Sequence, residues 1–147
     1  MTDAEPEILF TKGAKALARG EWPVALACFE NAARLKNTPV HNSFLALCIA
    51  RERGQYKKAI SLCTEAMEAE PDNSVLYLNL GKVHLLQKER DEAIRIFRLG
   101  LGREANAQII AELDKLGSRK PPPLSFLKRD NPLNRYLGKI LTRLGLR

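Results

Sequence analysis

The sequence predicts an all-α protein built as a stack of repeated antiparallel helix pairs. The first observation is a period, because Ala25, Ala59 and Ala93 stand 34 residues apart and a fixed period of this kind marks repeated supersecondary units. The second is that residues of matched size follow these alanines at fixed offsets. They are Phe29, Cys63 and Phe97 four residues later, and Ala32, Ala66 and Gly100 seven residues later.

The turns and helix starts of each unit follow from local residue chemistry. Gly20 interrupts one helical pattern, and Pro23 suits the first turn of the next helix. Thr38 is placed to cap the helix that follows. The second unit turns at Gly54, whereas the third turns without a glycine at 87–89. We therefore expect three units, at 6–39, 40–73 and 74–107.

Small residues at the helix crossings explain how each pair packs. Two antiparallel helices approach within about 8–10 Å only where the side chains at their crossing are small. Gly13 and Gly81 provide this space in the outer units, and we expect Phe29 and Phe97 to fill the gaps between neighbouring units. Leu47 takes the equivalent place in the middle unit, so we expect wider packing there.

The C-terminal part changes in composition and divides into three segments. Ile109, Ile110, Leu113 and Leu116 share one side of a helix that would close the open end of the stack. Three consecutive prolines at 121–123 then end helical structure. We expect a capping helix at 108–117, a Pro-rich linker at 118–131 and a basic amphipathic helix at 132–147.

The net charge of +7 resides entirely in the tail. Residues 1–117 contain equal numbers of basic and acidic residues, whereas 118–147 contain eight basic residues and one acidic residue. In the predicted tail helix, Arg135, Lys139 and Arg143 form a stripe opposite an apolar side.

Several partners could cover the apolar side of the tail helix. It could dock on its own chain, on another protein including a second copy of itself, or on an anionic membrane surface. Nucleic acid is the least favoured partner, because no recognisable binding module accompanies the charge.

Composition argues against a membrane-spanning or secreted protein. No apolar run reaches the length of a membrane-spanning helix, and the acidic start lacks the pattern of a signal peptide. Cys28, Cys48 and Cys63 are an odd set without a CxxC pair, which fits a reducing compartment. We therefore expect a cytoplasmic protein. The cysteines are read as small apolar residues, with a reactive thiol at Cys48, activated by His41, as the alternative.

No pattern of catalytic residues is visible. His41 and His84 lie in different units without the spacing of metal ligands. Gly100 and Gly102 lack the strand and third glycine of a phosphate-binding loop. The sequence thus predicts a protein that is not an enzyme and holds no metal or cofactor.

The repeat resembles the tetratricopeptide repeat family. The third unit carries the resemblance best, with Tyr77, Leu80, Gly81, Ala93 and Phe97 at the offsets of that repeat. The resemblance implies a right-handed solenoid of helix pairs whose first helices line a concave groove. It further implies a protein-binding scaffold or adaptor.

Family positions carried onto this sequence give a candidate groove. Some relatives in the family grip a peptide's terminal carboxylate with basic and amide side chains, but the matching positions here are Phe10, Ala14, Leu45, Val75 and Asn79. Only Asn79 suits that role, so the groove should favour an apolar peptide or an amphipathic helix. The groove residues implied are Phe10, Ala14, Leu17, His41, Phe44, Cys48, Arg51, Val75, Asn79 and Lys82.

Three functions remain open on this reading. The favoured one is a non-catalytic adaptor that binds a protein segment in the groove. The first alternative is a membrane-peripheral module that uses the basic tail. The second is an accessory domain whose tail docks on its own surface.

Overall fold

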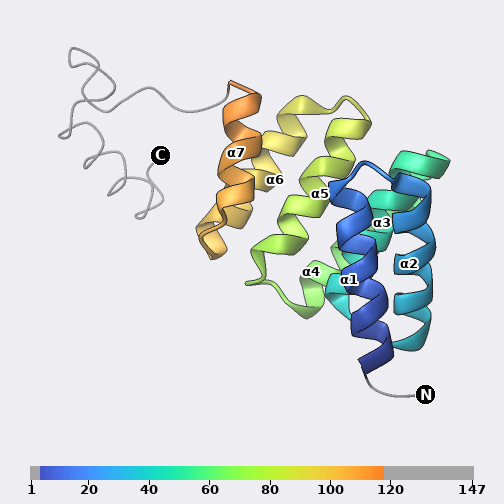
Figure 1. The fold of residues 1–147 in the computed structure, drawn as a ribbon. Coiled ribbons are helices and arrows are strands. Elements are labelled where there is room, and N and C mark those ends of the chain that lie inside the picture. The colour runs from blue at the N-terminus through green and yellow to red at the C-terminus, as the bar shows by residue number, and fades with distance from the viewer. Residues whose placement is uncertain (1–3, 118–147) are drawn as a thin grey trace, which may run out of the picture. The chain divides into compact units, whose positions relative to one another are not determined.

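The regular structure of residues 4–117, which the computed structural model describes, is entirely α-helical (Figure 1). This confirms the predicted all-α repeat fold. The helices are α1 (Ala4–Ala18), α2 (Trp22–Leu35), α3 (Pro39–Arg53), α4 (Tyr56–Ala69), α5 (Ser74–Leu86), α6 (Arg90–Arg103) and α7 (Ala107–Lys115).

Three turns bring the chain back on itself through a left-handed backbone conformation. Gly20 has φ 76° and Gly54 has φ 65°, which glycine adopts without steric cost. Lys88 takes φ 61° in the third turn, where no glycine is present. Helix α3 begins as predicted, because the Thr38 side chain accepts a hydrogen bond from the backbone N–H of His41 at 3.1 Å.

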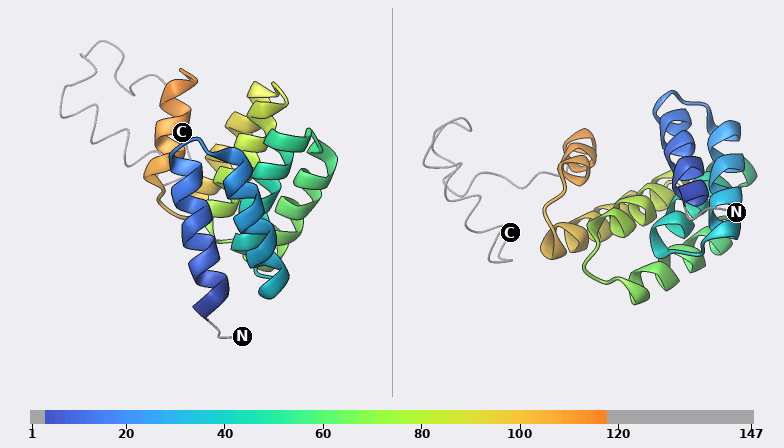
Figure 2. Two further views of the ribbon diagram at one scale, coloured as in Figure 1. Left: turned by 45° about the vertical axis from the view of Figure 1, so that its right-hand side comes forward. Right: turned by 60° about the horizontal axis from the view of Figure 1, so that its bottom comes forward.

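Successive helices pack as the antiparallel pairs α1/α2, α3/α4 and α5/α6, and α3 also packs along α5 (Figures 1 and 2). Within the first pair, a Cβ added to Gly13 would lie 2.6 Å from Cε1 of Phe29. A Cβ on Gly81 would overlap the ring of Phe97 in the same way. The glycines are therefore required by direct ring contact.

The place of the two phenylalanines corrects one expectation. Phe29 and Phe97 fill space inside their own pairs, because the missing Cβ of Gly13 or Gly81 leaves room for a ring from the adjacent helix. Phe29 additionally touches the next unit, with its ring centroid 5.4 Å from that of Phe44.

In the middle pair the larger residue is on the first helix and the smaller one on the second, which is the reverse of the outer pairs. Leu47 replaces glycine on α3, and Cys63 replaces phenylalanine on α4. Both are buried in one apolar cluster with Ala59. The smaller Cys63 offsets the larger Leu47 within this cluster, and the wider packing expected at Leu47 stays a prediction.

A compact unit comprises residues 1–109, and a second comprises 110–147, of which the structure describes 110–117. In the first unit, Asn106 caps α7 by accepting hydrogen bonds from the backbone N–H groups of Gln108 and Ile109. Its amide also donates to Oγ of Ser74 at 2.9 Å, which joins the starts of α5 and α7.

Beyond α7, Gly117 has the positive φ of 66° that suits a C-terminal cap. The predicted linker 118–131 and basic helix 132–147 lie outside the described residues, and so do Arg135, Lys139 and Arg143. None of the helices in the described part is long and apolar enough to span a bilayer.

Candidate functional site

An aromatic cluster joins α1 to α3 on the predicted groove side. The ring of Phe10 lies 5.0 Å from that of His41 in a stacked arrangement and 5.2 Å from that of Phe44 in an edge-to-face arrangement. Phe29 of α2 lies beneath, with its centroid 5.6 Å from that of Phe10. Phe10 and Phe44 are only half-buried, so their outer edges are open to a partner.

His41 is the buried member of this cluster and stacks on the ring of Phe10. Its side chain is buried, and Nδ1 lies 3.1 Å from the backbone oxygen of Lys36. Because a carbonyl oxygen can only accept, Nδ1 must carry the proton and donate it. Nε2 lies 3.7 Å from a carboxylate oxygen of Glu7. His41 therefore orients Phe10 rather than offering a surface of its own.

Asn79 is fully buried where α3 meets α5, with an exposed fraction of 0%. Its amide donates to Oγ of Ser43 at 2.9 Å, and that hydroxyl donates to the backbone oxygen of Val40. The Oδ1 atom of Asn79 has no hydrogen-bond partner. Asn79 thus serves the contact between helices, and in this state a peptide cannot reach it.

Cys48 and Cys63 behave as apolar core residues. Cys48 has an exposed fraction of 0%, and burial, assisted by the charge of Glu52, raises the pKa of its thiol to about 12. Burial alone raises the pKa of the Cys63 thiol to about 12. A thiol that stays protonated is a poor nucleophile. The burial of Cys48 therefore argues against a reactive thiol there and supports the packing interpretation for Cys48 and Cys63, whereas Cys28 is only half-buried.

Arg51, one of the predicted groove residues, makes a contact that the sequence did not indicate. The guanidinium of Arg51 lies over the ring of Trp22, with 5.2 Å from Cζ to the ring centroid. Trp22 stands at the start of α2, far from Arg51 in sequence, and no periodic pattern links the two. Because the cation–π contact leaves Arg51 exposed, it positions the charge without hiding it.

The predicted groove residues thus fall into two groups. Three of them, His41, Cys48 and Asn79, are buried and act within the fold. Arg51 is exposed, and the others are partly accessible along the first helices, namely Phe10, Ala14, Leu17, Phe44, Val75 and Lys82.

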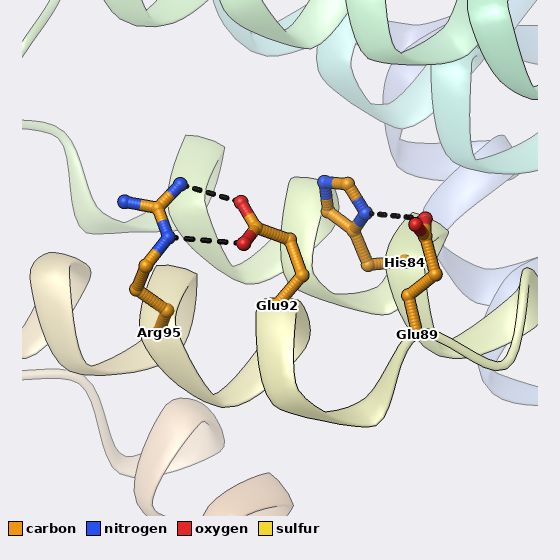
Figure 3. Close-up of polar contacts among 4 residues, drawn as sticks. All are labelled: His84, Glu89, Glu92 and Arg95. Atoms are coloured by element: carbon orange, nitrogen blue, oxygen red, sulfur yellow. Dashed lines mark hydrogen bonds and ion pairs between the residues drawn. The ribbon is translucent and has the colours of Figure 1, made fainter.

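Two polar contacts lie at the turn between α5 and α6 and in the first turns of α6, and they involve none of the predicted groove residues (Figure 3). Nδ1 of His84 lies 3.0 Å from Oε1 of Glu89, and Nε of Arg95 donates to Oε2 of Glu92 at 3.0 Å. That hydrogen bond lowers the pKa of the Glu92 carboxyl. The first contact joins the end of α5 to the N-cap of α6, whereas the second lies within α6. Within residues 4–117, no cluster of three or more His, Cys, Asp or Glu side chains could hold a metal ion.

Comparison with solved structures places this arrangement among known domains. The TPR domain of Arabidopsis OM64 matches with a TM-score of 0.59 and 23% identity, over 77% of this chain and 94% of that one. The first TPR of Spaghetti (RPAP3), bound to the HSP90 peptide SRMEEVD, matches with a TM-score of 0.60 and 21% identity, over 80% and 94%. The TPR2B domain of yeast Sti1, in complex with pHsp70, matches with 0.61 and 19%, over 78% and 94%.

These identities are low, so the structural matches establish the fold alone. A family model described as tetratricopeptide repeat also matches the sequence directly, over residues 50–113. Together with the paired helices, this match shows that residues 50–113 carry tetratricopeptide repeats, and the described part of the chain has the fold of a tetratricopeptide repeat domain.

Proposed function

We propose that this chain is a non-catalytic adaptor that binds an apolar peptide or an amphipathic helix along α1, α3 and α5. The observation that carries the proposal is the pair of half-buried rings, Phe10 and Phe44, held 5.2 Å apart on successive first helices. Ala14, Leu17 and Val75 extend the apolar surface beside them. Apolar side chains that project from adjacent helices suit an apolar helix face laid across them.

Two structural neighbours support a peptide as the class of ligand. One domain is bound to the HSP90 peptide SRMEEVD, and another is in complex with pHsp70. The surface in this chain differs in chemistry, because Phe10, Ala14 and Val75 are apolar and Asn79 is buried. We therefore favour an apolar ligand over an acidic peptide terminus, with Arg51 and Lys82 setting a mild preference for acidic residues at its edges.

Selection of helical peptides from a displayed library on the full chain would test this proposal. The fluorescence of Trp22, the only tryptophan, reports binding near Arg51. Phe44→Ala should weaken a selected peptide roughly 5–30-fold, because truncating an interface anchor costs about 1–2 kcal/mol. Lys82→Glu should weaken peptides with acidic flanks more than neutral ones.

Leu99→Ala is the matched control, since Leu99 is an exposed apolar residue on the second helix α6. It should leave the affinity unchanged. Equal binding by the wild-type chain and a folded Phe44→Ala variant would remove the site from this surface. Tighter binding of SRMEEVD than of any apolar peptide would overturn the proposed ligand class.

The basic tail supports a second candidate, a membrane-peripheral role. Residues 118–147 carry the whole net charge of +7, and a polybasic segment is attracted to anionic lipid. Sedimentation of the full chain with phosphatidylserine vesicles tests this candidate. Binding that disappears when Arg135, Lys139 and Arg143 are changed to glutamine would favour it, whereas no binding at low salt would eliminate it.

A further inference from the structure

Helix α7 has the residue pattern of a first helix in a fourth pair. Its N-cap, Asn106, accepts hydrogen bonds from the following backbone N–H groups, as Asn73 does at the start of α5. Superposing the two caps aligns Ile109 with Leu76, and both side chains are fully buried. The caps therefore give a consistent register between α5 and α7.

The same register shows what differs between the two helices. On α5, Tyr77, Leu80 and Val83 are buried in one cluster with Ile96 of the following helix α6. Gly100 of α6 also lies against Tyr77, since a Cβ added there would be 2.7 Å from Cβ of the tyrosine. The second helix of the pair thus covers this side of the first.

On α7 the aligned residues are equally apolar but less covered. Ile110 takes the place of Tyr77, and its exposed fraction is 45% where that of Tyr77 is 5%. Leu113 and Leu116 take the places of Leu80 and Val83 and are half-buried. In the part of the chain that the structure describes, no helix follows α7. The side of α7 that a second helix would cover is therefore apolar and partly open.

We propose that residues 132–147 supply this second helix and pack on the side of α7 formed by Ile110, Leu113 and Leu116. The segment follows α7 in the chain, as a second helix does in every other pair. Its sequence has one apolar side for that contact, with Leu133, Leu137, Ile140, Leu141 and Leu144.

The connection between the two segments is long enough. Residues 118–131 span up to about 45 Å when extended, whereas a helix of the length of α7 measures about 14 Å. The entropy of closing a loop rises only slowly with its length. A tethered segment also meets α7 at a far higher effective concentration than a second chain does, which favours docking within one molecule.

The charge pattern is compatible with this arrangement. When the apolar side faces α7, Arg135, Lys139 and Arg143 lie on the opposite side of the segment and remain in water. The basic stripe then keeps the completed stack soluble. This inference is independent of the peptide groove, because it concerns none of the groove residues.

Disulfide trapping in the full chain tests the contact. In a Cys28→Ser background, Ile110→Cys is combined with Ile140→Cys, while the native Cys48 and Cys63 stay buried. The control combines Ile140→Cys with Lys115→Cys, because Lys115 is exposed on a different side of α7. At micromolar protein, we expect an intramolecular disulfide that forms roughly tenfold faster in the test pair than in the control.

Two results of the trapping would overturn the proposal. Equal rates in the test and control pairs would mean that the tail does not rest on this side of α7. Disulfide-linked dimers in place of the intramolecular product would assign the surface to a second copy.

Hydrogen exchange on the otherwise unaltered chain gives a second readout. Amides in 133–144 should be protected, and Ile110→Asp should reduce their protection while α3 and α5 keep theirs. Tail amides that exchange as an unfolded peptide does would overturn the docking. Protection that arises only when phosphatidylserine vesicles are added would also overturn it and assign the segment to a lipid surface.

Discussion

The outer helix pairs and the middle pair fill the same crossing with opposite residues. In the outer pairs a glycine on the first helix, Gly13 or Gly81, receives a phenylalanine ring from the second. In the middle pair Leu47 stands on the first helix and Cys63 on the second, and both are buried. The comparison teaches that the repeat maintains the combined size of the two residues, because close packing tolerates neither a void nor an overlap.

The turns show a related contrast. The first two pairs reverse at glycines with positive φ, whereas the third reverses at Lys88 in the same backbone region. Here the hydrogen-bonded contact between His84 and Glu89 connects the two helix ends across the turn. A side chain in the left-handed region costs about 1–2 kcal/mol, so contacts around this turn must compensate for the missing glycine.

Truncating the second-helix residue of a crossing to alanine should have the largest effect on stability, and the effect should differ between the outer and middle pairs. Phe97→Ala should lower the free energy of unfolding by about 3–5 kcal/mol, since a fully buried ring leaves a cavity. Cys63→Ala removes one atom from the same position in the middle pair and should cost about 1 kcal/mol. Urea denaturation of the full chain measures both. Similar losses would show that the two positions do not play corresponding roles.

Placing the large residue on α4 and the small one on α3 tests directly whether the side chains at positions 47 and 63 complement each other in size. Cys63→Phe should destabilise the chain by about 1–3 kcal/mol, because the ring overlaps Leu47. Adding Leu47→Gly recreates the glycine–phenylalanine contact of the outer pairs. The double variant should therefore recover part of the lost stability, although glycine costs a helix about 1 kcal/mol.

The corresponding double-mutant cycle measures how strongly the two positions interact. Thermal or urea denaturation of the four chains should give a favourable coupling of about 0.5–3 kcal/mol. Strictly additive effects would mean that Leu47 and Cys63 do not share one crossing.

The difference between the turns predicts smaller changes in stability, with opposite signs for a glycine placed at Lys88 and a lysine placed at Gly54. Lys88→Gly should raise stability by up to about 1 kcal/mol, since glycine adopts positive φ freely but adds entropy to the unfolded chain. Gly54→Lys is the mirror variant and should lower stability by about 1–2 kcal/mol. Melting temperatures of both variants decide the matter. A loss of stability in Lys88→Gly would show that the lysine side chain itself holds the turn.

The smallest effect concerns the ion pair beside the third turn. The pKa of Glu92 is lowered from 4.5 in the folded chain, first by the hydrogen bond from Arg95. The stabilisation is therefore complete above about pH 5 and disappears as the pH falls through the lowered folded pKa. Because the pair is exposed, Glu92→Gln should cost only a few tenths of a kcal/mol at pH 7. Urea titrations at pH 7 and about pH 3 test this, and a difference that persists in acid would contradict it.

Local chemistry accounts for what the sequence predicted well. The turns at Gly20 and Gly54 and the cap at Thr38 depend on residues within one helical turn of each other. The accessible groove residues Phe10 and Phe44 follow from position in the repeat, since each occurs at the same place on its first helix. The repeated sequence pattern therefore suffices to predict the fold and many of the accessible residues of the candidate surface.

Contacts between distant segments account for what the sequence left out. His41, Cys48 and Asn79 occupy groove positions by the repeat pattern, yet side chains from other helices bury them. The contact of Arg51 with Trp22 and the placement of Phe29 against Gly13 likewise join residues of different helices. No single-helix period contains that information.

By itself, the sequence determined the helices, their pairing by a 34-residue period and the resemblance to the tetratricopeptide repeat, because helix caps, turns and periodic apolar faces are local properties. Only the tertiary structure decided which of the predicted groove positions stay open to a partner, and that Leu47 and Cys63 are buried in one cluster in the middle pair. The physical reason is that burial and fit are properties of two packed surfaces. Each surface is completed by residues that are far away in the chain.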